Sequence, residues 1–136
     1  MSVHANTVNH WLRARAPGIQ LDDEGIALLT ADDATVIAIE VPEDGEVCYF
    51  YAPVCPLSAD APDADLCRAL ELNRFGRPLG GCWLAWDPEF AMLTLCHNLH
   101  IPANDAIAFG NTVDNFFASL REARNQLSLS PVESLT

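Results

Sequence analysis

Lysine is absent from this sequence of 136 residues, and basic side chains of any kind are scarce. Seven arginines stand against 19 acidic residues, which gives a formal net charge of −12. Nucleic-acid binding needs clustered cations that neutralise phosphates, and anionic membrane surfaces attract basic segments. The composition therefore argues against both kinds of partner, and it favours solubility and attraction to basic proteins.

Basic residues are missing altogether between Ala16 and Leu66, and most of the acidic residues fall in that stretch. The plain interpretation is a set of acidic turns and a solvated face. A second interpretation is an electrostatic guide for a cationic segment of a partner. The acidic residues concerned are Asp22, Asp23, Glu24, Asp32, Asp33, Glu40, Glu43, Asp44, Glu46, Asp60, Asp63 and Asp65.

No apolar run approaches the ~18–20 residues that a membrane helix needs, and the first residues contain no apolar signal-peptide core. We therefore expect a cytoplasmic protein without membrane contact. The cysteines agree, because they are odd in number, widely spaced and mostly in apolar runs, as is typical of free thiols in a reducing compartment. They are Cys48, Cys55, Cys67, Cys82 and Cys96.

The apolar periodicity predicts a single α+β domain with the element order α-β-β-β-α-β-β-α. We expect an antiparallel twisted sheet flanked by three helices, a domain spanning residues 1–127 and a flexible tail at 128–136. Asn104 is the expected N-cap of the last helix. The predicted elements are a helix at 2–16, strands at 25–30, 35–41 and 47–54, a loop at 52–61, a helix at 62–73, strands at 82–87 and 92–99, and a helix at 104–127.

Catalytic and cofactor motifs are hard to find. The glycines around residue 80 lack the Lys-Ser/Thr of a phosphate loop and precede a strand instead of a helix. Cys96, His97 and His100 invite a metal hypothesis, but zinc ligands usually come as two matched pairs, and surface or strand-end histidines are the simpler interpretation. Neighbours on a strand point to opposite faces, so Cys96 and His97 do not form a nucleophile and base. We expect no enzymatic activity, no metal and no cofactor.

The residues from Leu72 to Gly81, with the strand at 82–87, resemble the helix-to-strand junction of class I type III secretion chaperones, the Tir-chaperone or CesT-like family. That junction carries a leucine ahead of Phe-Gly and then Gly-Gly before a short strand, as here at Phe75-Gly76 and Gly80-Gly81. The entrance to the loop after the third strand, the hairpin after residue 87, the long last helix and the element order also resemble the family, over roughly Val8 to Leu127.

The resemblance implies a homodimer without enzymatic activity and with a role in virulence. It would bind the N-terminal segment of a type III secreted effector in extended form, keep the effector soluble and deliver it to the secretion apparatus, whose ATPase is a further expected partner. In relatives the dimer interface comes from the second helix and the strand after the glycines. The effector lies in apolar grooves of the first helix and the sheet, and it often pairs with a sheet edge.

The roles that the resemblance implies indicate candidate residues in this sequence. For effector binding they are Val8, Trp11, Leu12, Ile26, Leu28, Ile37 and Ile39, although ordinary core packing is an equally open interpretation of each. For the dimer interface they are Leu66, Ala69, Leu70, Phe75, Trp83 and Trp86. Because Trp83 and Trp86 are three apart on a strand, we expect one to point inward and one outward.

Two other functions stay open at this point. A regulatory module of similar fold could bind a different protein and take no part in secretion. A small cysteine- or histidine-dependent metalloenzyme would need Cys96, His97 and His100 to converge with an acidic group.

Overall fold

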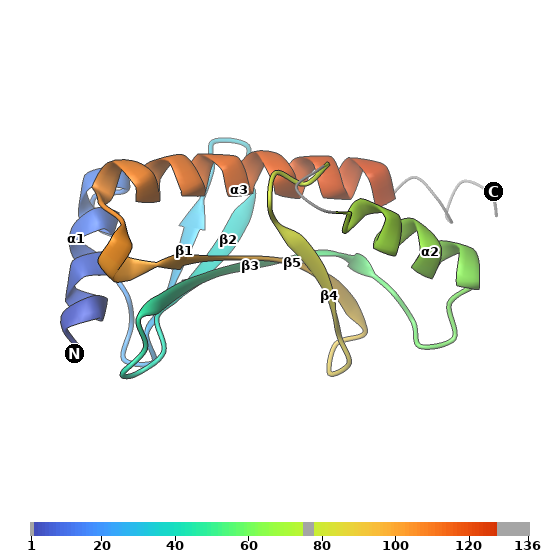
Figure 1. Cartoon of the computed structure of the whole chain (residues 1–136), viewed down its shortest axis with the longest axis horizontal. Helices are drawn as coiled ribbons and strands as arrows, with labels where there is room; N and C mark the ends of the chain where they lie inside the picture. The colour runs from blue at the N-terminus through green and yellow to red at the C-terminus, as the bar shows by residue number, and fades with distance from the viewer. Residues whose placement is uncertain (1, 75–77, 128–136) are drawn as a thin grey trace. The chain divides into compact units, whose positions relative to one another are not determined.

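The computed structural model describes residues 2–74 and 78–127. Within these residues, three α-helices, five strands and one short 3-10 helix follow one another, and the helices and strands have the expected α-β-β-β-α-β-β-α order (Figure 1). The elements are α1 (Val3–Arg15), β1 (Ile26–Thr30), β2 (Val36–Glu40), β3 (Val47–Pro56), α2 (Asp63–Leu72), β4 (Trp83–Asp87), β5 (Met92–His100), η1 (Ile101–Ala103) and α3 (Ala106–Leu127).

The strands form one five-stranded sheet in the order β1-β2-β3-β5-β4, so β1 and β4 are its edge strands. β1 with β2, β2 with β3, and β4 with β5 pair antiparallel. The short turns rich in Asp, Gly and Pro explain the hairpins, because such links allow only neighbouring antiparallel strands. The expected α+β fold class and antiparallel sheet are confirmed.

The chain divides into two compact units, each described here by itself. Of the described residues, the first unit contains those up to Tyr51 together with Asn98–Phe117, and the second contains those within Ala52–His97 and from Ala118 to Leu127. The predicted tail at 128–136 lies outside the described residues, so the domain boundary at residue 127 stays a prediction.

The first unit buries an aromatic cluster between one face of its strands and its helices. The ring centroid of Phe109 lies 5.6 Å from that of Trp11 and 5.9 Å from that of Phe50, and Phe116 lies 5.9 Å from Phe50. Figure 1 shows α1 beside the first turns of α3, where an Arg15 guanidinium nitrogen lies 3.0 Å from an Asp114 carboxylate oxygen. Burial of such rings is the main stabilising contribution to this unit.

The second unit holds α2 by polar contacts to backbone atoms. The Asn73 amide donates to the Leu84 carbonyl at 3.1 Å, and its oxygen accepts from the Leu84 N–H at 2.6 Å. Arg68 donates from Nε and Nη2 to the Gln126 carbonyl, at 2.9 and 2.7 Å, near the end of α3. Only Ala69 of α2 is buried, so these contacts position a helix that contributes little to the core.

Two details of the predicted elements are wrong. The third strand was expected to end by residue 54, inside a loop at 52–61, but β3 continues through Pro53 to Pro56. The register of β2 against β3 extends only as far as Tyr51, so the prolines occur after that pairing ends, where a missing N–H is tolerated. The N-cap of α3 is Asp105 in place of Asn104, because Asp105 Oδ1 accepts from the Ala108 N–H at 2.8 Å.

Candidate functional site

The register of β1, β2 and β3 sorts their side chains onto two faces. Antiparallel partners share a face, and Leu28 is opposite Ala38, which is opposite Tyr51. We call this side the outer face and define it by eight residues: Ile26, Leu28, Thr30, Val36, Ala38, Glu40, Tyr49 and Tyr51. The other side, the inner face, contains Ala27, Leu29, Ile37, Ile39 and Phe50, all of them buried.

The outer face exposes large apolar side chains. Leu28 is 59% exposed, Tyr49 41% and Val36 40%, whereas Ala38 between them is buried. Isolated exposed apolar residues are ordinary on a protein surface, but a group of them on neighbouring strands of one sheet marks a contact surface for a partner. The outer face is therefore the first candidate site.

The free edge of β1 borders the outer face. At its start the Ile26 backbone is already paired, since the Ile26 carbonyl accepts from the Asp22 N–H at 2.8 Å and the Ile26 N–H donates to Asp22 Oδ1 at 3.0 Å. Hydrogen-bonding direction alternates along a strand, so the N–H and C=O groups of Leu28 and Thr30 point to the same free edge. These four groups can pair with an extended chain laid beside β1.

A single carboxylate interrupts the apolar character of the outer face. Glu40 lies between Ile26 and Tyr49 in the register and is half-buried. The Tyr51 hydroxyl donates to Glu40 Oε1 at 2.8 Å. Burial, followed by the Glu40 hydrogen bond and the charges of Glu40 and Asp22, raises the pKa of Tyr51 to about 12. The phenol is therefore protonated at neutral pH and keeps the Glu40 carboxylate in place.

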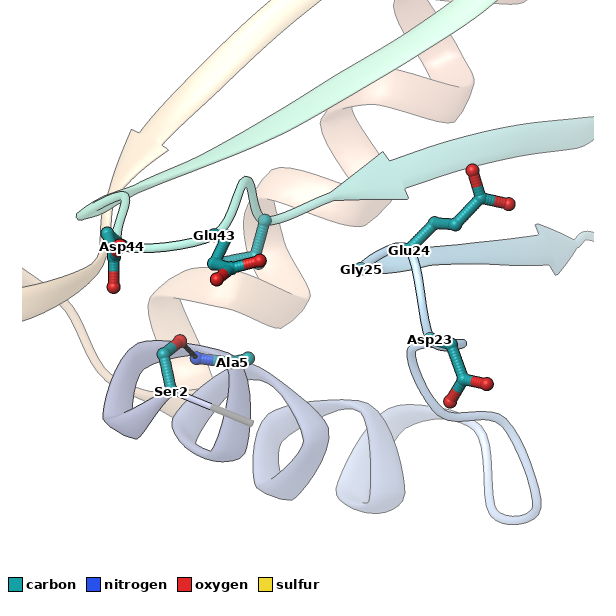
Figure 2. Close-up of a pocket in the computed structure, with 8 residues that line it drawn as sticks. Ser2, Ala5, Asp23, Glu24, Gly25, Glu43 and Asp44 are labelled. Atoms are coloured by element: carbon teal, nitrogen blue, oxygen red, sulfur yellow. Dashed lines mark hydrogen bonds between the residues drawn. The ribbon is translucent and has the colours of Figure 1, made fainter.

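A pocket of about 530 Å³ lies elsewhere in the first unit, at the start of α1 (Figure 2). Its wall includes Ser2 Oγ, which accepts from the Ala5 N–H at 3.1 Å and so caps α1. Two turns supply its carboxylates, from Asp23, Glu24, Glu43 and Asp44. The pocket thus gathers part of the long acidic stretch of the sequence at one place.

A second group of exposed apolar side chains lies in the second unit, on α2 and on the β4–β5 hairpin. Leu70 is 67% exposed and Leu66, one helical turn earlier, is 43% exposed. Phe90, in the turn after β4, is 68% exposed. A ten-residue helix with its leucines turned outward is marginal by itself, so this surface also indicates a protein contact.

The two β4 tryptophans differ from the expectation of one inward and one outward. Trp83 is 38% exposed and Trp86 43% exposed. Trp86 also donates from Nε1 to the Leu57 carbonyl at 2.8 Å. The reason is that β4 is an edge strand, and a side chain there has a neighbouring strand on only one side.

The structure separates the predicted effector-binding residues into two groups. Ile26 and Leu28 belong to the outer face. The other five pack in the core at no more than 5% exposure: Val8, Trp11, Leu12, Ile37 and Ile39. Sequence reasoning missed Val36, Glu40, Tyr49 and Tyr51, because alternation groups side chains within one strand but the register that relates neighbouring strands is not visible in the sequence.

The predicted dimer residues lie on two elements of the second unit, and one of them, Ala69, is buried within its own subunit and offers no surface to a partner. Leu66, Ala69 and Leu70 lie on α2, and Trp83 and Trp86 lie on the strand that Asn73 ties to that helix. Phe75 lies outside the described residues. Phe90, in the turn after β4, is a further exposed apolar side chain. It was not predicted, because a phenylalanine in a turn has no periodicity to indicate its direction.

The cysteines are all free thiols, and burial raises the pKa of the Cys48 thiol to about 12. Burial raises the pKa of Cys96 as well and lowers that of His97. Among residues 2–74 and 78–127, no group of three metal-ligating side chains was found, and no helix there is long and apolar enough to cross a membrane.

Comparison with known proteins adds a family match. A family model described as the Tir chaperone protein (CesT) family matches residues 12–124. No curated protein matches the sequence.

Solved structures share the fold at low sequence identity. A chain in the crystal structure of the ExsC–ExsE complex is 18% identical with a TM-score of 0.74, covering 96% of this chain and 100% of that chain. A chain in the HopA1–SchA chaperone–effector complex is 12% identical with a TM-score of 0.67, covering 88% and 91%. A chain in the ExoU–SpcU complex from the type III secretion system of Pseudomonas aeruginosa is 17% identical with a TM-score of 0.66, covering 88% and 93%.

Proposed function

This chain belongs to the Tir chaperone protein (CesT) family, and we propose that it is a type III secretion chaperone whose client lies in extended form across the outer face. The client is the N-terminal segment of a secreted effector. The chaperone keeps that segment unfolded, soluble and ready for delivery to the secretion apparatus, whose ATPase is a further partner.

The observation that carries this proposal is the outer face beside an open strand edge. An added strand would hydrogen-bond the Leu28 and Thr30 backbone groups, which gives affinity without regard to sequence. Its alternate side chains would cover Leu28, which is 59% exposed, and its neighbours on the outer face. Hydrogen bonds to the β1 backbone and burial of the apolar outer-face side chains both require an extended chain, so they suit a client that must stay unfolded.

The buried candidates support this surface from beneath. Ile37 and Ile39 fill the inner face, and Trp11 packs on Phe109 at 5.6 Å between centroids. Their burial makes the sheet rigid, so the outer face is preformed and the client alone loses conformational entropy on binding.

The protein works as a homodimer through its second surface. Leu66, Leu70, Trp83 and Trp86 each keep more than a third of their area exposed. Twofold pairing would bury this surface against its own copy, since symmetric dimers are the commonest assembly and their interfaces are apolar. A dimer also offers two outer faces, so that one client can wrap from one subunit to the other.

The proposed chaperone needs no catalysis, metal or cofactor, and it acts in the bacterial cytoplasm. Its mechanism is binding alone, with the free energy supplied by apolar burial and by strand pairing.

Co-purification from the native cell tests the client site. The wild type and a Leu28→Asp variant are used as bait, and the captured protein is trimmed by limited proteolysis to find which segment is protected. We expect the wild type to protect an N-terminal effector segment. Leu28→Asp should lower its affinity about 100-fold, because a carboxylate would be buried against the client without a partner.

The matched control is Ile107→Asp, which introduces the same charge at a side chain that is 75% exposed on α3, away from the outer face. It should bind the client like the wild type. An equal loss of client affinity in both variants would refute the proposed site. Protection of a segment far from the effector N-terminus would refute it as well.

A further inference from the structure

Glu40 is the one charged side chain on the outer face. Its two partners across the strands are Ile26 and Tyr49, and the exposed apolar side chains of Leu28 and Val36 lie on the same face. A client that covered this face with apolar groups alone would bury the Glu40 carboxylate without compensation, which is costly. The face therefore favours a client group that pairs with a carboxylate.

The Tyr51 hydroxyl holds Glu40 at one oxygen only. The hydrogen bond of 2.8 Å involves Oε1, and no arginine or histidine of the described chain forms an ion pair with Glu40. A carboxylate accepts several hydrogen bonds, so Oε2 stays available to a donor on a partner. Fixing one oxygen in advance lowers the entropy lost when the second is engaged.

The surroundings of Glu40 are also negative. The negative charge of Asp22 contributes to the raised pKa of Tyr51. Asp22 also hydrogen-bonds the backbone N–H and C=O groups of Ile26, at the start of the free edge of β1. A client strand that pairs with Leu28 therefore ends its pairing beside two carboxylates. A cationic side chain is the complementary group at that end of the strand.

We propose that Glu40 selects clients that carry one basic side chain, arginine or lysine, among the apolar side chains that cover the outer face. This inference rests on the proposed function and narrows it to a class of segment. Arginine fits best, because its fork of N–H donors can reach Glu40 while its methylene groups lie on Ile26.

Synthetic peptides provide the probe. Each has about a dozen residues, alternates valine and serine, and carries a fluorescent label and either arginine, glutamine or glutamate at one central valine position. Fluorescence anisotropy gives the affinity of each for the wild type, for Glu40→Gln, for Glu89→Gln and for Leu28→Asp. Glutamine at position 40 keeps an oxygen for Tyr51 and removes only the charge.

The wild type should bind the arginine peptide about tenfold more tightly than the glutamine peptide, and the glutamate peptide least tightly. Glu40→Gln should bind the arginine and glutamine peptides equally. Glu89→Gln makes the same change at an exposed turn residue after β4 and should keep the wild-type preference. Raising the salt concentration should reduce the preference in the wild type.

The results that would overturn the inference fall into two distinguishable classes. If the wild type binds the arginine and glutamine peptides equally and Leu28→Asp abolishes both, the outer face holds clients without charge selection and the proposed function stands. If no peptide binds, or if Leu28→Asp binds all three like the wild type, the outer face is not the client site and both proposals fail.

Discussion

Glycine 25 shows how one residue sets the start of the outer face. Its φ of +82° is a backbone conformation that side chains with a Cβ rarely adopt. A Cβ there would also overlap the carbonyl of Val41, whose N–H donates to the Gly25 carbonyl at 2.9 Å. The turn from α1 into β1 therefore needs glycine for two independent reasons, strain and lack of space.

Gly25→Ala should destabilise the protein more than Gly18→Ala. Both positions have positive φ, at +82° and +94°, but a Cβ at Gly18 would meet no atom within 4 Å. We expect Gly18→Ala to cost about 1–2 kcal/mol from backbone strain and Gly25→Ala a further ~1–3 kcal/mol from the overlap. Urea unfolding of both variants measures the difference, and equal costs would show that space at Gly25 plays no part.

The thiols should differ sharply in reactivity. Cys48 is fully buried and its pKa is raised to about 12, so little thiolate forms and little reagent reaches it. Cys67 is exposed on α2. With iodoacetamide at pH 8, followed by peptide mass spectrometry, Cys67 should be modified first and Cys48 last.

All five thiols should react in denaturant without a reducing agent, because all five cysteines are free. Fewer than five would show disulfides and would contradict the cytoplasmic assignment. Modification of the native protein at Cys48 as fast as at Cys67 would show that the first unit opens readily.

At the scale of elements, hydrophobic periodicity predicted the three α-helices and the five strands, but not the short 3-10 helix η1 or the faces of the sheet. Ile26 and Leu28 were grouped with Ile37 and Ile39, yet the register places Leu28 opposite Ala38 and Ile37 opposite Leu29. A shift of one residue in a hairpin exchanges the two faces, and the turn at 31–35 does not reveal its register from sequence.

The error at β3 has a similar origin. Prolines normally indicate that a strand is ending, and the prolines at 53 and 56 therefore led to a predicted loop at 52–61 that overlapped the end of the strand. Whether a proline is tolerated depends on which neighbour its nitrogen would face, and that neighbour is known only from the sheet order. A hydrogen bond helps to hold the extra residues of β3 in place, because the Pro53 carbonyl accepts from Arg124 Nη2 at 2.7 Å.

The exposed leucines of α2, Leu66 and Leu70, give the sharpest prediction at the scale of elements. Leu70 is 67% exposed, so Leu70→Asp should leave the subunit folded and separate the proposed dimer. The reason is that the dimer interface would bury an unpaired carboxylate, at a cost of about 3–5 kcal/mol. Light scattering gives the mass, and circular dichroism checks the fold.

Ile107→Asp is again the control, since it adds the same charge on α3 and should leave the dimer intact. A wild type that has the mass of a monomer at micromolar concentration would contradict the dimer. Unfolding of Leu70→Asp would show that Leu70 belongs to the core of its own subunit.

For the whole molecule, composition and family resemblance predicted the class of function but not the location of the site. The acidic stretch before Leu66 is distributed over turns, over the pocket at the start of α1 and, through Glu40, over the outer face. Charge of this kind steers a basic client toward the surface more than it adds affinity. The affinity comes from apolar contact and strand pairing, which depend on register and exposure.

Site-specific photo-crosslinking tests the central claim most directly. The photoreactive amino acid p-benzoylphenylalanine replaces Leu28 in one variant and Ile107 in another, and both are irradiated in the native cell and analysed by mass spectrometry. We predict that position 28 crosslinks to the N-terminal segment of a secreted effector and that position 107 does not. Crosslinking of that segment from position 107 but not from position 28 would contradict the outer face as the client site.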